Sequence, residues 1–204
     1  MGPGDTGFQQ AYDVLQEQVG HKMIITISGN AGSGKSTVAK EIAKKLGYNF
    51  YCVGDLRGKM ATERGMTIDQ LNKLGEKEAW TDNLADEYQA DLAKKEDNFI
   101  VDSRLGFHFI PAALKIFLKV HPNESARRVF INQRPDEERK ESIEEVKQML
   151  TARDENDRQR YMKYYNVDHL DLSHYDLVID TTNLKLEQLQ EKIFNYLRKK
   201  GMNC

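Results

Sequence analysis

Cysteine is scarce in this sequence, because only Cys52 and Cys204 occur among 204 residues. Two cysteines cannot supply the disulfide framework of a small secreted domain or the four ligands of a structural zinc site. The histidines do not change this, since no two of them have the spacing of metal ligands. So little cysteine is typical of proteins from a reducing compartment, and we expect a cytoplasmic location.

Long hydrophobic runs and an excess of one charge are also missing. No apolar run is long enough to span a bilayer, and the first twenty residues contain no unbroken apolar segment like that of a signal peptide. The net charge is only −2, although 30% of the residues are charged. This balance gives the chain as a whole no reason to bind nucleic acid or a membrane, and we expect neither as a partner.

A glycine-rich stretch, MIITISGNAGSGKST from 23 to 37, is the strongest positive feature. Gly29, Gly34, Lys35 and Ser36 fit the pattern G-x-x-x-x-G-K-[ST] between an apolar strand pattern and a helical one. In such a P-loop, backbone N–H groups and a helix N-terminus surround a phosphate, the lysine adds a mobile charge, and the hydroxyl reaches Mg²⁺. The predicted nucleotide-binding residues are Gly29, Asn30, Ala31, Gly32, Ser33, Gly34, Lys35, Ser36 and Thr37.

Short apolar segments alternate with helical patterns along the rest of the chain. The predicted strands cover 23–29, 48–53, 98–102, 114–120 and 177–180, and the predicted helices include 54–64, 123–133, 142–165 and 186–200. This alternation predicts an α/β fold with a five-stranded parallel sheet, helices on both faces, and a ligand site at the carboxyl ends of the strands. We expect residues 1–22 to be an N-terminal extension and residues 23–204 to form one domain.

Two charged residues follow the third predicted strand. Asp102 ends that strand, where P-loop proteins place the acid that holds Mg²⁺ directly or through water, so Ser36 and Asp102 are the predicted metal ligands. Arg104 lies on the same edge, where its guanidinium can bind a phosphate in a bidentate manner. The simpler interpretations are a turn residue and a surface arginine. Among the histidines, only His108 lies near Arg104 in the sequence, so it is the one histidine that we consider as a possible site residue.

The charged run RDENDRQR at 153–160 lies in the long predicted helix. Helical spacing places Arg153, Asp157 and Arg160 on one face. Such a run can be a solvated face laced with ion pairs. It can also be a lid whose arginines cover a transferring phosphoryl group and exclude water.

From Met23 to Lys200 the sequence resembles cytidylate kinases, in particular the short archaeal-type nucleoside monophosphate kinases. The resemblance rests on the P-loop, on the segment VDSR that ends at Arg104, and on the pattern R-D-x-x-D-R-x-R at 153–160 followed by YDLVIDT from Tyr175. It implies a P-loop kinase fold and reversible transfer of the γ-phosphoryl group from Mg-ATP to CMP or dCMP. It also implies an acceptor lobe at about 55–97, a lid at about 134–160, small nucleotides as partners and a monomeric state.

The resemblance assigns roles to individual residues. Lys35, Arg104 and Arg153 would be catalytic, and Arg104, Asp157 and Arg160 would hold the acceptor. Asp55 would begin the acceptor lobe. Related sequences carry an arginine where this chain has Gly58, so the resemblance leaves Arg57 or Lys59 to replace it. The base contacts stay open among Thr67, Asp69, Asn72 and Lys73.

Two other functions remain open at this point. The first is a kinase for a different small acceptor, such as AMP, UMP or a compound that is not a nucleotide. The second is an ATP-binding switch that acts on a macromolecular partner, since P-loop folds carry many unrelated functions. The glycine at position 58 favours the switch, whereas the Asp157 and Arg160 pair favours a kinase.

Overall fold

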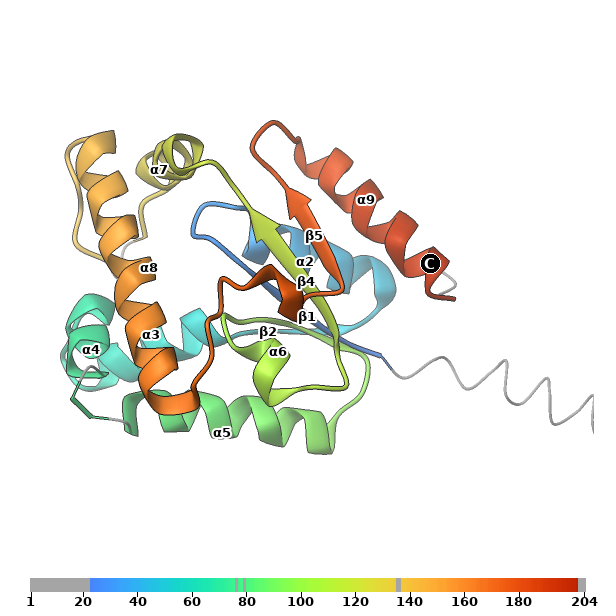
Figure 1. The fold of residues 1–204 in the computed structure, drawn as a ribbon, viewed down its shortest axis with the longest axis horizontal. Helices are drawn as coiled ribbons and strands as arrows, with labels where there is room; N and C mark the ends of the chain where they lie inside the picture. Colours follow the sequence, from blue (N-terminus) through green and yellow to red (C-terminus); the bar gives the residue numbers. More distant parts are fainter. Residues whose placement is uncertain (1–22, 76, 79, 135–136, 202–204) are drawn as a thin grey trace, which may run out of the picture.

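A parallel sheet of five strands forms the centre of the molecule (Figure 1). The computed structural model describes residues 23–201 except positions 76, 79, 135 and 136, so the expected extension at 1–22 lies outside the described residues. The strand order is β2-β3-β1-β4-β5, which confirms the expected α/β class and the parallel sheet. The strands are β1 (Ile24–Gly29), β2 (Asn49–Cys52), β3 (Phe99–Asp102), β4 (Leu114–Lys119) and β5 (Leu177–Asp180).

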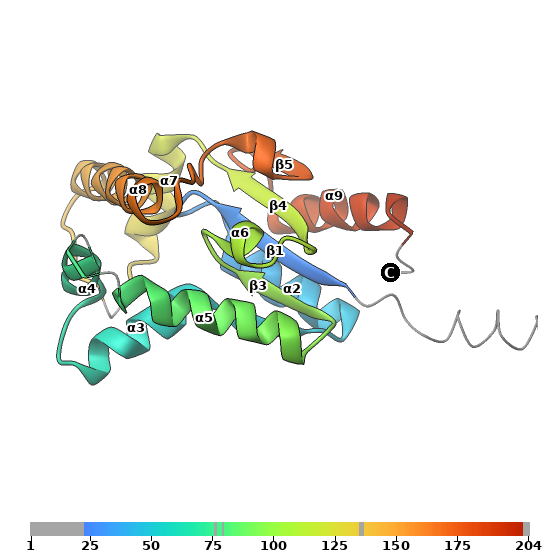
Figure 2. The same cartoon turned by 60° about the horizontal axis from the view of Figure 1, so that its bottom comes forward.

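Helices cover both faces of this sheet, as Figure 2 shows. Helices α2 (Lys35–Leu46) and α9 (Leu186–Lys199) pack on one face, and α5 (Trp80–Lys95) packs on the other, beside the short α6 (Gly106–Phe109). Side chains alternate along each strand accordingly: Ile100 belongs to the core under α2 and α9, whereas Phe99 and Val101 belong to the core under α5. Each fully buried side chain of this size contributes roughly 1.5–3 kcal/mol relative to an exposed one.

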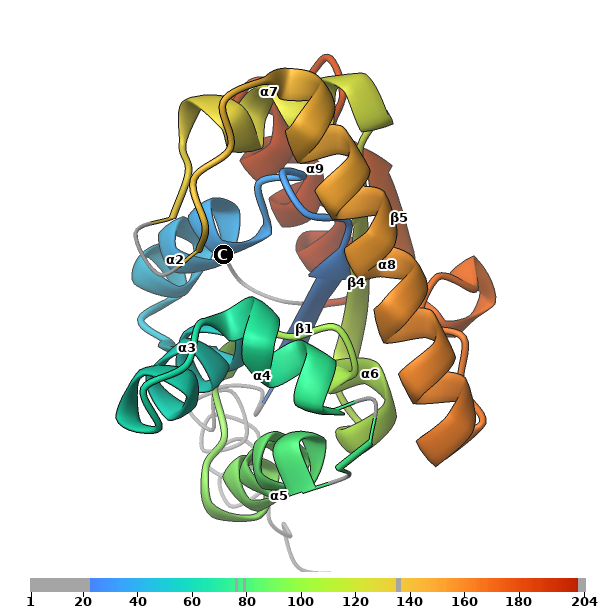
Figure 3. The same cartoon turned by 90° about the vertical axis from the view of Figure 1, so that its left-hand side faces the viewer.

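The remaining helices gather at the carboxyl ends of the strands (Figure 3). They are α3 (Val53–Glu63), α4 (Ile68–Gly75), α7 (Pro122–Ile131) and α8 (Ile143–Tyr165), and a 3-10 turn at Leu172–His174 precedes β5. Strands β3 and β4 flank β1, and the chain passes from one side of β1 to the other between them. Open α/β sheets bind ligands at such a switch point, outside the carboxyl ends of the strands.

The inward face of α8 changes character along its length. Ser142 caps the helix by accepting a hydrogen bond from the backbone N–H of Glu145 at 3.2 Å, and the first buried residues, Val146 and Leu150, are apolar. Further along the same face the buried residues are Asp157 and Arg160. Charged side chains on a buried face need partners of opposite charge or hydrogen-bonding groups in the interior, because burying an unpaired charge is costly. No helix among the described residues is both long and apolar enough to cross a membrane.

Most predicted elements match the structure to within two residues at their ends. Two differences, one at the start of α7 and one between β3 and β4, have a physical reason. Helix α7 begins at Pro122, one residue earlier than expected, because a proline at the first helical position needs no N–H partner. The connection between β3 and β4 contains α6, which the sequence pattern does not predict. Its four residues are too few to show a helical period.

Candidate active site

A cavity of about 640 Å³ lies at the carboxyl ends of the strands. Its wall at one end is the loop between β1 and α2, and its wall at the other end comes from α3, α4, α5 and α8. It therefore brings together segments from the first and second halves of the chain. The lining includes the predicted residues Ala31, Gly32, Gly34, Lys35, Ser36, Thr37, Arg57, Asp102, Arg104, Arg153, Asp157 and Arg160.

The loop between β1 and α2 has the geometry of a phosphate cradle. Gly29 has φ +142°, and a Cβ there would lie 2.0 Å from the carbonyl oxygen of Leu118, so no side chain fits. Gly34 precedes α2 with φ +90°, and no side chain of the described residues caps the helix. The first turn of α2 also contains no acidic residue. The N-terminal N–H groups and the positive end of the helix dipole are thus left for an anion.

Lys35 and Ser36 begin α2 at the edge of this cradle. Lys35 Nζ donates a hydrogen bond to the carbonyl oxygen of Asn30 at 2.9 Å, which holds the ammonium group over the loop. Burial lowers the pKa of Lys35, and the negative charge of Asp102 opposes that shift. The lysine can exchange this backbone partner for a phosphate oxygen.

Ser36 and Asp102 bring two oxygen groups together at the end of β3. Ser36 Oγ donates a hydrogen bond to Asp102 Oδ2, and the Asp102 residue is only 5% exposed. A hydroxyl and a carboxylate fit Mg²⁺, which binds oxygen ligands and usually keeps waters and substrate phosphates in its shell. Among the described residues no three His, Cys, Asp or Glu side chains form a metal-binding group.

Cys52, the last residue of β2, lies beside Asp102. Its Sγ atom is 3.8 Å from Asp102 Oδ2. Burial raises the pKa of the Cys52 thiol to about 12, and the Asp102 charge adds to that shift. The thiol is therefore protonated and has no nucleophilic role at neutral pH.

Arg104 lies at the centre of a charge cluster with α8. Its Nη1 donates to Asp154 Oδ1 at 2.8 Å, and its Nε lies 3.0 Å from Asp157 Oδ2. Arg160 pairs with the other oxygen of Asp157. Burial alone would raise the pKa of Asp157, but the charges of Arg104 and Arg160 hold it below its ordinary value. Three predicted site residues thus form one connected cluster.

His169 completes this cluster, although the sequence pointed to His108. Its Nε2 is 3.3 Å from Arg104 Nη1, and its residue is 3% exposed. Burial, followed by the charge of Arg104, lowers the pKa of His169 to about 4, so the ring is neutral and Nε2 accepts from the guanidinium. His108 instead packs against the rings of Phe109 and Tyr165.

Arg57, and not Lys59, occupies the cavity on the α3 side. Its guanidinium donates to the carbonyl oxygen of Thr81 at 2.7 Å and to Asn72 Oδ1 at 3.0 Å. Lys59 has a side chain that is 75% exposed and lies 3.9 Å from Glu63, so the expectation that it binds substrate is not supported. The reason is geometric, because two residues along a helix correspond to a rotation of about 200°.

Asp55 also lies apart from the cavity lining. Its side chain is 57% exposed and lies 3.4 Å from Arg134 Nη2. It occupies the first turn of α3, where the positive end of the helix dipole stabilises a carboxylate. The structure therefore places Asp55 in the first turn of α3, outside the cavity lining but paired with Arg134, which is one of the lining residues.

Arg153 joins α8 to two other segments. Its Nη2 lies 3.0 Å from Asp69 of α4, and its Nη1 lies 3.0 Å from Glu137, which precedes α8. Burial alone would lower the pKa of Arg153, whereas Glu137 and Asp69 raise it, so the guanidinium keeps its charge. Asp69, which the sequence left open as a base contact, is the partner of this arginine.

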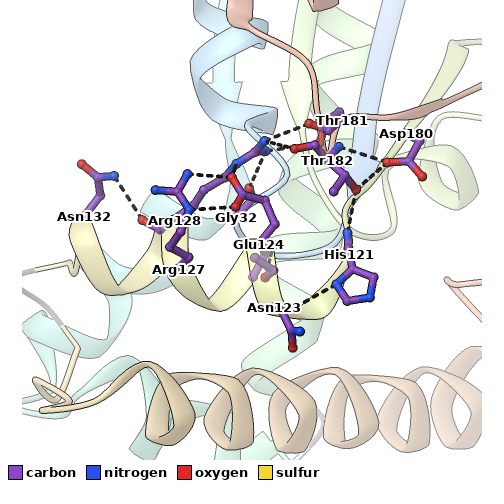
Figure 4. A network of polar contacts seen from close by, with 12 residues as sticks. Gly32, His121, Asn123, Glu124, Arg127, Arg128, Asn132, Asp180, Thr181 and Thr182 are labelled. Atoms are coloured by element: carbon purple, nitrogen blue, oxygen red, sulfur yellow. Dashed lines mark hydrogen bonds and ion pairs between the residues drawn. The ribbon is translucent and has the colours of Figure 1, made fainter.

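Arg128 of α7 forms a further network at the rim of the cavity (Figure 4). Its Nη2 donates to the carbonyl oxygens of Thr181 and Thr182 at 2.8 and 3.1 Å, and its Nη1 donates to that of Gly32 at 3.3 Å. Glu124 on the same helix accepts from its Nε at 2.8 Å. One side chain thus connects α7, the loop after β5 and the phosphate loop. From the sequence, Arg128 is one of three arginines, with Arg134 and Arg139, that could contribute to the site and cannot be ranked.

Sequence reasoning missed His169 and the buried Gln89 of α5, which lines the cavity, and it named Arg128 only as one of three arginines, with Arg134 and Arg139, that it could not rank. None of them belongs to a recognisable motif, and each reaches the site from an element far away in the sequence. The local sequence contained no signal for Gln89, because it is one more polar residue in a largely polar helix.

Comparison with known proteins agrees with this geometry. The model of the cytidylate kinase-like family matches residues 24–183. A cytidylate kinase of Methanothrix thermoacetophila is 42% identical over 159 residues, which cover 78% of this chain and 88% of that protein. A cytidylate kinase of Archaeoglobus fulgidus is 34% identical over 172 residues, which cover 84% of this chain and 92% of that protein.

Solved structures add a comparison at the level of the fold. A shikimate kinase from Bacteroides thetaiotaomicron has a TM-score of 0.60 at 18% identity, covering 86% of this chain and 98% of that chain. Identity that low shows a shared fold and nothing about substrates. The family is shown instead by the model match, which spans most of the chain and includes both the phosphate loop and the charged face of α8. The chain belongs to the cytidylate kinase-like family.

Proposed function

We propose that this protein transfers the γ-phosphoryl group of ATP to CMP or dCMP, giving ADP and the nucleoside diphosphate. One observation carries the proposal: a single cavity has a phosphate cradle at one end and the cluster of Arg104, Asp157 and Arg160 at the other. A donor and an acceptor bound at these two ends would face each other. Its relatives at 42% and 34% identity, both cytidylate kinases, support the same reaction.

On the donor side, the backbone of the phosphate loop and Lys35 would hold the β- and γ-phosphates. Ser36 and Asp102 would hold Mg²⁺, which supplies positive charge to the phosphate oxygens when it is bound. Arg128 fixes the loop after β5 against Gly32, and so fixes the rim of the donor end.

On the acceptor side, Arg104 and Arg57 would bind the phosphate of the acceptor. Asp157 and Arg160 would hold its nucleoside part from α8. We propose α3 to α5 as the acceptor lobe, about 55–97, and the segment of about 134–160 as the lid. The bridge from Arg153 to Asp69 links these two lobes across the cavity and supports the assignment.

The reaction needs no covalent intermediate. An oxygen of the acceptor phosphate attacks the γ-phosphorus in line, while Lys35, Arg104 and Arg153 stabilise the charge that spreads over the transferring oxygens. The charged face of α8 lines the cavity, and a lid closed over the bound nucleotides would exclude water and so favour the acceptor over hydrolysis. Positioning and electrostatics therefore supply the acceleration.

The direct test is an assay of ADP release from Mg-ATP with CMP, dCMP, UMP, AMP and GMP at equal concentration, beside a control without an acceptor. We expect strong stimulation by CMP or dCMP. Stimulation by another acceptor alone would identify a different small-molecule kinase. Turnover that no acceptor increases would contradict the proposal and favour an ATP-binding switch.

The structure weakens the case for that switch. The case rested on the missing arginine at position 58, and Arg57 places a guanidinium in the cavity from the neighbouring position. We further propose that the enzyme is a monomer in the cytoplasm, since closure of two lobes requires them to be free and the sequence has only two cysteines.

A further inference from the structure

Gln89 is a buried polar residue that the proposed mechanism does not use. It lies on α5, is 1% exposed and contributes to the wall of the cavity on the acceptor side. Ala85, Arg57 and Asn72 line the same cavity. Buried amides normally have partners for both their nitrogen and their oxygen, because an unpaired polar atom in the interior is costly.

The hydrogen bonds around Gln89 fix the direction of its amide. Its Nε2 donates to the carbonyl oxygen of Ala85 at 3.2 Å and to Asp86 Oδ1 at 3.4 Å. The opposite orientation would place the amide oxygen against two other oxygens, so it is excluded. Tyr165 of α8 donates to the second oxygen of Asp86, which holds this carboxylate from the other side. The arrangement leaves Gln89 Oε1 as a buried acceptor with no partner in the part of the chain that the structure describes.

We propose that Gln89 Oε1 accepts a hydrogen bond from the 4-amino group of the acceptor's cytosine ring, and that Gln89 thereby selects CMP and dCMP over UMP. This inference depends on the proposed function, because it concerns the acceptor of that reaction. Cytosine carries an amino donor at position 4, whereas uracil carries a carbonyl oxygen there. The donor satisfies the unpaired oxygen, whereas the carbonyl would place two acceptors face to face.

The unpaired oxygen of Gln89 affects the choice between CMP and UMP more than the affinity for CMP itself. A site with a buried hydrogen-bonding group rejects a ligand that leaves this group unpaired far more strongly than an apolar site rejects a small change of shape. Asp86 and Tyr165 keep the amide from turning over to suit uracil. An adenine ring also carries an amino group, so the inference concerns the choice between the two pyrimidines.

The test replaces Gln89 by methionine, which keeps the length of the side chain and has no strong acceptor. We expect Gln89→Met to lower kcat/KM for CMP by about 10- to 100-fold, with little change for UMP, so that the ratio of the two values approaches one. The KM for ATP should stay the same. Gln190→Met is the matched control, because Gln190 is a buried glutamine of α9, in the layer of the molecule on the other side of the sheet, where it pairs with Lys45.

A second measurement uses the unmodified enzyme with the monophosphate of 2-pyrimidinone riboside, which is CMP without the 4-amino group. This analogue should be a poor acceptor for the wild type and as good as CMP for Gln89→Met. If the methionine variant is not folded by circular dichroism, Gln89→Leu takes its place. A CMP to UMP ratio that stays at the wild-type value in the folded variant would overturn the inference, while activity of the wild type on CMP would still uphold the proposed function. A wild type that no nucleotide stimulates would instead refute that function.

Discussion

The two ends of the cavity are built in different ways. At the donor end, backbone N–H groups form the cradle, and their directions follow from a close approach between Gly29 and β4. At the acceptor end, charged side chains from several elements form the site, and they are already paired with one another. Arg104, for example, contacts both Asp154 and Asp157. The cradle consists of backbone donors, whereas in the cluster each charged group has a partner of opposite charge.

This difference between the two ends affects which ligands the acceptor end can bind. Removing one partner from a buried ion pair costs about 3–5 kcal/mol, because it leaves a charge without compensation. A ligand can therefore open the cluster around Arg104 only if it brings its own negative charge to the same place. The phosphate of a nucleotide does this. The cluster around Arg104 is therefore suited to an anionic acceptor.

The largest expected effect concerns the donor end. Lys35→Met should lower kcat by on the order of 10³-fold, because the ammonium group stabilises charge on the transferring phosphoryl group. Thermal unfolding should stay close to the wild type, since Lys35 Nζ makes a single hydrogen bond to a backbone oxygen. The exposed Lys44, later in the same helix, supplies the control variant Lys44→Met. Equal turnover of Lys35→Met and the control would show that this loop does not hold the reacting phosphates.

The next largest effect concerns two carboxylates at the acceptor end, those of Asp157 and Asp154. Asp157→Asn should raise the KM for CMP by about 10- to 100-fold and leave the KM for ATP unchanged, because the residue contacts the nucleoside in our proposal. Asp154→Asn is the matched variant, since Asp154 also pairs with Arg104 but its side chain is 25% exposed against 6% for Asp157. The second variant should have the smaller effect. Equal changes in both, or a change in the KM for ATP, would contradict a nucleoside contact by Asp157.

The same contrast explains which features could be predicted from the sequence. The donor end is contiguous, so the pattern from Gly29 to Ser36 specifies it locally, and the strands around it follow from their apolar runs. Asp102 was predictable because the end of a strand fixes its position. Arg153, Asp157 and Arg160 were placed on one face by helical spacing alone.

The acceptor end could be predicted only in part, because its residues meet through tertiary packing. His169 reaches Arg104 from a position 65 residues away, and nothing in its local sequence indicates this. The choice between Arg57 and Lys59 depended on how α3 is rotated, which sequence did not decide. Gln89 looked like one more polar residue on a polar helix until its burial and its unpaired oxygen were known.

A smaller effect concerns the response of the acceptor end to acid. The pKa of His169 is lowered to about 4 in the folded protein, mainly by burial, against about 6.5 in an unfolded chain. Between these values the unfolded chain binds a proton that the folded protein does not, so stability falls as the pH is lowered. From pH 7 to pH 5 this group alone should remove roughly 2 kcal/mol from the free energy of unfolding.

Urea unfolding at both pH values measures this effect. His169→Gln keeps a hydrogen-bond acceptor for Arg104 but cannot be protonated, so its loss of stability between pH 7 and pH 5 should be smaller by about the same amount. The exposed His121 provides the control His121→Gln. If wild type and His169→Gln lose the same stability over this interval, the histidine is not kept neutral by its surroundings.

The smallest expected effect comes from a comparison of Arg57 with Lys59. It tests which of the two binds the acceptor phosphate in place of the arginine that related sequences carry at position 58. Arg57→Met should raise the KM for CMP by about tenfold, which corresponds to one charge-assisted hydrogen bond, while kcat and the KM for ATP change little. Lys59→Met should behave like the wild type, because its side chain points away from the cavity wall and is 75% exposed. Initial rates with varied CMP at saturating ATP measure both. The reverse result would mean that α3 turns by about half a rotation when the acceptor binds, and the acceptor end would then be a site that is assembled by its ligand.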